Sequence, residues 1–185
     1  GLQNMLHALK QDPFALESVW MALITFDIEA KELIELKPLE NIVIPEIIVP
    51  KSGATFLGAA LELLIDKVSK EVKKTTQDAK GDWRPLLFIM TDGAPSDLEA
   101  FESALPHIRA INFASIIACA AGPKAKKESL LLLTENVVVL DVMDSASFSN
   151  FFKWLSSSVS AGSSSVGLVG QNTLPLPPSE IQLVI

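Results

Sequence analysis

The sequence predicts an α/β protein with a doubly wound, mostly parallel Rossmann-like sheet that carries helices on both faces. Two observations support this fold class. Apolar runs of strand length alternate along the chain with segments of helical periodicity, and most of these runs are apolar throughout, which is typical of parallel strands buried on both faces. The chain has 185 residues, of which 49% are hydrophobic and 20% charged. This size and composition suit one globular domain with a substantial core.

The first element expected is a helix near the start of the chain, with one apolar face formed by Leu2, Met5, Leu6 and Leu9. No capping Ser, Thr, Asp or Asn precedes it, so we expect the chain as given to begin inside a helix. A strand is predicted at 18–27, and an edge strand at 30–40, where Lys, Glu and Pro38 suit a sheet edge. Residues 41–54, interrupted by two prolines, predict a connecting loop.

Helix and strand then alternate to the end of the predicted domain. Helices are expected at 55–74, 97–110, 124–135 and 145–160, and strands at 86–90, 111–122 and 136–142. Ser96 is placed to cap the second of these helices, and residues 86–90 predict a fully buried strand. We place the domain at residues 1–162. The remaining Gly-, Ser- and Pro-rich residues, 163–185, predict a tail with strand character at 180–185.

Composition excludes several classes of partner. The net charge of −7 argues against sequence-independent nucleic-acid binding, which needs clustered cations. The single cysteine, Cys119, cannot form an internal disulfide and fits a reducing compartment. No apolar run is long enough to span a bilayer, and no signal peptide opens the chain. These features predict a cytoplasmic protein without nucleic-acid or membrane partners.

The stretch RPLLFIMTDGAPSD, residues 84–97, places a carboxylate where a buried strand gives way to a glycine turn. Ligands of open α/β sheets bind at the carboxyl ends of the strands, so Asp92 is a candidate site residue. Asp92 either accepts hydrogen bonds from loop amides or binds a ligand. Thr55, at a second predicted loop, is either a helix cap or a second oxygen donor beside Asp92. A hydroxyl and a carboxylate together are the hard donors that Mg²⁺ prefers.

These loops and their surroundings resemble von Willebrand factor A (vWA) domains, specifically the bacterial TerY-like branch associated with tellurium-resistance and stress gene clusters. The similar stretches are ITFD (24–27), SGATFLGAAL (52–61), KGDWRPLLFIMTDGAPSD (80–97), TENVVVLDV (134–142) and FFKWLSSSVS (151–160). The resemblance implies a metal-ion-dependent adhesion site, in which Thr55 and Asp92 match two of the family's ligands. The family's Asp-x-Ser-x-Ser triplet has no counterpart here, because the strand before it would precede Gly1.

The resemblance also implies a consequence for the sheet. In the family's strand order the strand that is absent here is central, between residues 20–26 and 86–90. We therefore expect a gap at that position, with the tail packed along the outside of the sheet rather than inserted into the gap.

By resemblance, the function expected is that of a non-enzymatic, metal-dependent protein-binding or scaffold module in a tellurium-resistance or stress-response system. A divalent cation, Mg²⁺ first with Mn²⁺ and Ca²⁺ left open, would leave a coordination position for a Glu or Asp carboxylate of a partner. The partners implied are kinase- or phosphatase-like proteins, and the rim expected around the metal consists of Gly53, Gly93, Ala94 and Pro95. Trp83, in a loop expected near the site, suits either partner contact or packing. The alternative is a Rossmann-like Mg²⁺-dependent hydrolase or phosphotransfer enzyme that uses Asp92.

Overall fold

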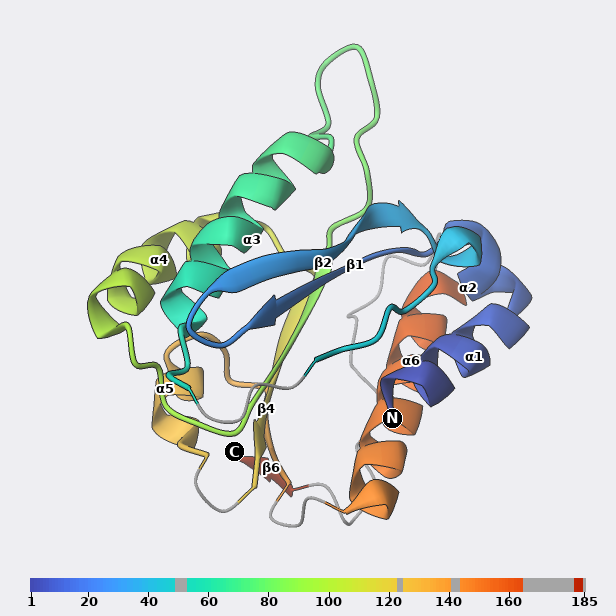
Figure 1. Ribbon diagram of the computed structural model, residues 1–185. Helices are drawn as coiled ribbons and strands as arrows, with labels where there is room; N and C mark the ends of the chain where they lie inside the picture. The colour runs from blue at the N-terminus through green and yellow to red at the C-terminus, as the bar shows by residue number, and fades with distance from the viewer. Residues whose placement is uncertain (49–52, 123–124, 141–143, 165–181, 185) are drawn as a thin grey trace.

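The computed structural model describes residues 1–48, 53–122, 125–140, 144–164 and 182–184 (Figure 1). The chain forms a mixed α/β structure. Its helices are α1 (Leu2–Gln11), α2 (Pro13–Ser18), the 3-10 turn η1 (Leu39–Asn41), α3 (Leu57–Glu71), α4 (Leu98–Ala110), α5 (Lys127–Leu131) and α6 (Ser145–Ser164). Its strands are β1 (Trp20–Phe26), β2 (Ala30–Pro38), β3 (Leu86–Thr91), β4 (Ser115–Ala121), β5 (Val137–Leu140) and β6 (Gln182–Val184).

The strands form two separate sheets. β3, β4 and β5 are parallel neighbours, and β6 pairs antiparallel with the outer side of β5. β1 and β2 form an antiparallel hairpin with no hydrogen-bonded connection to the larger sheet among the described residues. The expected parallel sheet, compatible with a Rossmann-like fold, is therefore confirmed for three strands. The strand predicted at 18–27 is present as β1, and among the described residues it is not hydrogen-bonded to this sheet.

Helices cover both faces of the larger sheet (Figure 1). On one face, a cluster that we call the α6 cluster combines buried residues of α1, α2 and α6 with every second residue of β4: Met5, Leu6, Leu9, Ala15, Phe151, Trp154, Leu155, Ile117, Cys119 and Ala121. On the other face, the α4 cluster combines α3, α4 and α5 with the alternate residues of β4: Leu57, Leu61, Phe101, Leu105, Ile108, Leu130, Ala118 and Ala120. Successive side chains of a strand point to opposite faces, so a strand that is apolar throughout supplies both clusters. None of the helices in the described part of the chain is both long and apolar enough to cross a membrane.

The N-terminal helix confirms its predicted apolar face, and a second helix follows it that periodicity did not indicate. Met5, Leu6 and Leu9 of α1 are buried. In α2, the Asp12 carboxylate accepts hydrogen bonds from the amides of Phe14 and Ala15, and Pro13 occupies the first turn. An Asp-Pro pair at these two positions is a helix-start signal in its own right.

Several boundaries differ from the predictions. α5 spans only five residues, Lys127–Leu131, of the predicted 124–135 helix. The 86–90 strand is not fully buried, and Leu86 is 36% exposed, because β3 is the edge strand of its sheet. α6 continues to Ser164, past the predicted domain boundary at residue 162.

The predicted gap and the predicted position of the tail can both be compared with the described residues. β1 and β3 are not paired with each other, and no described strand lies between them. The short strand expected within 180–185 is present as β6, which joins the larger sheet beside β5, at the edge opposite β3, and is not inserted between β1 and β3. Tail residues 165–181 and 185 lie outside the described residues.

Candidate functional site

The loops that carry Thr55 and Asp92 meet at the carboxyl end of β3. A methyl group added to Gly93, the residue after Asp92, would lie 2.9 Å from the Thr55 hydroxyl oxygen. The carboxyl end of β1 joins them, because the Phe56 amide donates to the Asp27 carbonyl at 2.8 Å. Asp92 itself is exposed and Thr55 is half-buried. The structure therefore brings the two predicted site loops together, and the residue at their contact is a glycine, Gly93.

Two hydrogen bonds fix the position of Thr55 relative to the loop after β3. The Thr55 amide donates to Ser96 Oγ at 3.0 Å, and the Ser96 amide donates to the Thr55 carbonyl at 2.9 Å. The prediction that Ser96 caps α4 is wrong, since its hydroxyl is used on the Thr55 loop and the residue at the N-cap position of α4 is Asp97. Both bonds are made by the Thr55 main chain, so neither of them involves the Thr55 side-chain hydroxyl.

Asp97 caps a helix that is not its own. Its two carboxylate oxygens accept hydrogen bonds from the amides of Gly58 and Ala59, at 3.1 Å and 2.8 Å, in the first turn of α3. A carboxylate there satisfies amides that lack helical partners and lies at the positive end of the helix dipole. Thr55 is therefore not the cap of α3, although it lies just before the helix, and the residue at the N-cap position, Phe56, offers no side-chain acceptor.

Close contact between α3 and α4 makes this cap possible. A methyl group added to Gly58 would lie 2.3 Å from the Phe101 amide nitrogen and 2.7 Å from the Ala100 carbonyl carbon, so only glycine fits. The start of α4 is thereby brought to the start of α3, and both helices begin beside the carboxyl end of β3.

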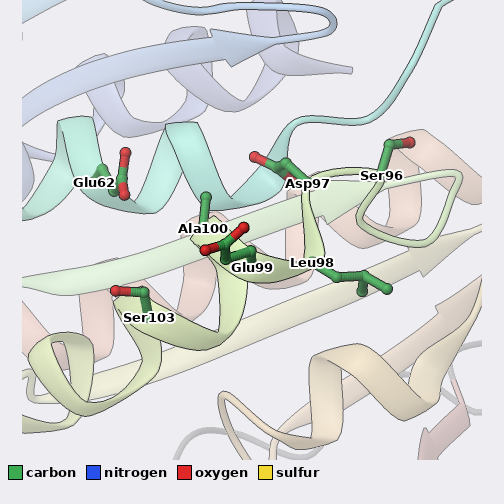
Figure 2. A pocket seen from close by; sticks show the side chains of 7 residues that line it. All are labelled: Glu62, Ser96, Asp97, Leu98, Glu99, Ala100 and Ser103. Carbon is green, nitrogen blue, oxygen red and sulfur yellow. The ribbon is translucent and has the colours of Figure 1, made fainter.

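An open hollow lies along the outer side of this contact between the two helices (Figure 2). Figure 2 shows the Asp97 side chain directed toward the start of α3 and the Leu98 side chain directed away from α3. The side chains around it are Glu62, Ser96, Asp97, Leu98, Glu99, Ala100 and Ser103. In the described residues, no three His, Cys, Asp or Glu side chains are grouped so as to hold a metal ion. The acidic character of the hollow therefore does not by itself make a metal site.

The predicted rim residues differ in what they offer to a partner. Gly53 is exposed, and Gly93 and Ala94 are half-buried. Pro95 is buried and does not present a surface to a partner. Trp83 is not near the site: it precedes β3, whereas Asp92 follows it, and a six-residue strand spans about 20 Å. Its ring instead lies 5.1 Å from the Lys80 ammonium nitrogen.

Cys119 is not placed to act as a reactive thiol. It lies in the middle of β4 with no exposed surface, and burial raises the pKa of its thiol to about 12. The reactive form of a cysteine is the thiolate, so this side chain is a packing residue at neutral pH, as predicted from its apolar surroundings.

Comparison with protein-family models and with curated proteins gives no match. Among solved structures, the fold is similar to that of proximal thread matrix protein 1 from the mussel byssus, with a TM-score of 0.57 and 20% sequence identity. The similarity covers 88% of this chain and 40% of that protein, so the chain spans less than half the length of its structural relative. At this identity the comparison supports the arrangement of helices and strands and leaves the activity open.

Proposed function

We propose that the chain is a non-enzymatic protein-binding module, whose binding site is the carboxyl end of β3 with Thr55 and Asp92 at its centre. The observation that carries the proposal is the contact between the two loops, in which the Thr55 hydroxyl lies against the glycine that follows Asp92. The Asp92 carboxylate is exposed, so it does not carry the desolvation cost of a buried charge, and with the Thr55 hydroxyl it offers two hard oxygen donors to a cation.

The donors present suit a hydrated divalent cation rather than a tightly held one. Mg²⁺ keeps several waters and needs only one or two protein carboxylates, of which Asp92 can supply one, while Thr55 can add a hydroxyl oxygen. Water and a Glu or Asp carboxylate from a partner would complete its coordination. The proposal therefore includes a weak metal site whose affinity rises when partner and metal bind together.

The setting of the proposal comes from the resemblance to TerY-like vWA domains described above. It comprises a cytoplasmic location, a role in tellurium resistance or stress response, and kinase- or phosphatase-like partners. The mussel protein contributes only its fold to this proposal.

The test is Mn²⁺ titration followed by nuclear magnetic resonance, because bound Mn²⁺ broadens the signals of nearby amides. We expect broadening at Thr55 and Gly93, with a dissociation constant on the order of 10⁻³ M. The variants are Asp92→Asn, which removes the charge, and Thr55→Val, which removes the hydroxyl and keeps both main-chain bonds to Ser96. Both should abolish the local broadening, while Glu62→Gln on the nearby hollow should leave it unchanged.

A second arm tests the partner carboxylate and the enzymatic alternative. A short peptide with one glutamate should bind more tightly when Mn²⁺ is present, and its glutamine version should not. Broadening that is unaffected by Asp92→Asn would contradict the metal site. Hydrolysis of p-nitrophenyl phosphate with Mg²⁺, lost in Asp92→Asn, would instead favour the hydrolase reading.

A further inference from the structure

The loop between α3 and β3, residues 72–85, carries an exposed tryptophan that the proposed site does not use. Figure 1 shows this loop projecting from the body of the structure beyond the end of α3. Trp83, near the end of the loop, is 62% exposed. Single exposed apolar side chains are common on protein surfaces, so what Trp83 can do depends on how it is held and on what surrounds it.

The main chain before Trp83 is fixed by contacts within the loop. The Lys73 amide donates to the Asp82 carboxylate at 2.8 Å, and the Asp82 amide donates to the Lys73 carbonyl at 2.9 Å. The Gly81 amide donates to Thr75 Oγ1 at 3.1 Å. A methyl group added to Gly81 would lie 2.4 Å from the Thr75 amide nitrogen, so the two arms of the loop lie directly against each other.

The main chain after Trp83 is bonded to the connection between α4 and β4. The Arg84 guanidinium donates hydrogen bonds to the carbonyls of residues 112 and 113. The Pro85 carbonyl accepts a hydrogen bond from the Ala114 amide at 2.8 Å. Trp83 therefore lies between two segments that are each held by hydrogen bonds. A side chain on such a segment loses less conformational entropy on binding than one on a free loop.

Three lysines lie in the same loop as Trp83. The Lys80 ammonium nitrogen lies 5.1 Å from the centre of the Trp83 ring, within the range of a cation–π contact. Lys73 and Lys74 belong to the arm that lies against residues 81–82. All three lysines are exposed, and none of them forms an ion pair with a residue that the structure describes. Their charges are therefore free to pair with a partner.

The charge of this loop is opposite to that of the whole chain, and this contrast indicates the kind of partner. Residues 72–85 contain four cationic and two acidic residues, in a chain of net charge −7. One of the two carboxylates, that of Asp82, already accepts the Lys73 amide. A nucleic acid would continue past the loop over the acidic remainder of the chain, which would repel its phosphates. The charge pattern therefore favours a short acidic segment of a protein.

We propose that Trp83 together with Lys73, Lys74 and Lys80, which we call the Trp83 surface, binds a short acidic segment of a partner protein. The segment carries an apolar side chain among its carboxylates. The carboxylates pair with the lysine ammonium groups, and the apolar side chain covers the exposed part of the Trp83 ring. One exposed ion pair contributes little, so the tryptophan and several lysines act together. The strand β3, about 20 Å long, separates this surface from Asp92, so the binding is independent of the metal in the proposed function.

The probe is the peptide Glu-Asp-Leu-Pro-Asp-Glu, added in the presence of EDTA and followed by nuclear magnetic resonance. We expect the signals of the Trp83 indole N–H and of the Lys80 and Gly81 amides to shift as the peptide is added. A peptide with glutamine and asparagine in place of its acidic residues should bind about tenfold more weakly or worse, because it loses the ion pairs. Raising the salt concentration should weaken binding of the acidic peptide, since these pairs are exposed.

Variants separate the Trp83 surface from the charge of the protein as a whole. Trp83→Ala and the triple change Lys73→Gln/Lys74→Gln/Lys80→Gln should each lower the affinity for the peptide by about tenfold. Both changes keep the hydrogen bonds of the loop, which are made by the main chain and by other side chains. A matched control removes three charges from exposed lysines elsewhere and should change the affinity by no more than about twofold. The control changes are Lys126→Gln, Lys127→Gln and Lys153→Gln.

Three results would overturn this proposal. An equal loss of affinity in the control variant would show attraction by overall charge alone. Tighter binding of single-stranded oligothymidine at the Trp83 indole would identify a nucleic acid as the occupant. Shifts at Trp83 that depend on protein concentration without peptide would identify a second copy of the chain. Asp92→Asn should bind the peptide unchanged in EDTA, so failure of the proposed metal site and failure of the Trp83 surface are distinguishable.

Discussion

Thr55 and Ser96 exchange two hydrogen bonds across 41 positions of sequence, one from each amide, to the hydroxyl and the carbonyl of the other residue. This pair fixes the loop before α3 against the loop after β3. Asp92 and Gly93 lie between β3 and Ser96, so these two hydrogen bonds determine how close the Asp92 loop comes to the Thr55 hydroxyl.

Gly58→Ala should destabilise the protein by about 1–3 kcal/mol in the free energy of unfolding, because the new methyl group would overlap the α4 backbone. Urea denaturation measures this difference. Gly53→Ala is the matched control, since its methyl group would make an ordinary 3.5 Å contact with Ile28. Equal stability of the two variants would contradict the close contact between α3 and α4.

Asp97→Ala should lower the free energy of unfolding by about 1–2 kcal/mol, because two amides at the start of α3 lose their acceptor. Asp97→Asn should retain part of the cap, since one amide oxygen still accepts. Glu62→Ala, an exposed change on the same helix, should stay within about 0.5 kcal/mol of the parent protein. Thermal or urea unfolding compares the three, and a loss no greater in Asp97→Ala than in Glu62→Ala would show that the cap contributes nothing.

Gly93→Ala should weaken metal binding at the site while leaving the stability of the fold nearly unchanged. Its methyl group would lie 2.9 Å from the Thr55 hydroxyl, a side-chain atom that can rotate away. We expect the free energy of unfolding to change by no more than about 0.5 kcal/mol, and Mn²⁺-induced broadening to be clearly reduced. Unchanged broadening would mean that the Thr55 hydroxyl takes no part in metal binding.

Cys119 should react with thiol reagents only when the protein unfolds, because its thiol is buried and its pKa is raised to about 12. The folded state therefore holds the proton more tightly than the unfolded state. Its contribution to stability is complete below the unfolded pKa near 9 and is lost as pH rises toward 12. Above about pH 9 the free energy of unfolding should fall more steeply in the parent protein than in Cys119→Ala, by up to about 1.4 kcal/mol per pH unit. Parallel pH profiles, or rapid labelling of the folded protein at pH 8, would contradict this.

Local sequence determined most of the elements. The 3.6-residue spacing of Met5, Leu6 and Leu9 and the uninterrupted apolar character of 115–121 each specify how a segment buries itself, whatever it packs against. The exposed position of Asp92 at the end of β3 could likewise be predicted from the sequence, because a strand followed by a glycine turn exposes the intervening side chain. The same reasoning could have found α2 from Asp12 and Pro13.

Only the tertiary structure decided which side chain serves which loop. Ser96 and Asp97 both have the chemistry of caps for α4, yet they bond to Thr55, Gly58 and Ala59, because Gly58 lets the two helix starts meet. A sequence shows which donors and acceptors exist, but pairing between residues about 40 positions apart depends on how closely the helices pack. The same holds for β1, whose composition suits a strand of the parallel sheet. Its hydrogen bonds go instead to β2, because the two strands are joined by a three-residue turn and pair locally.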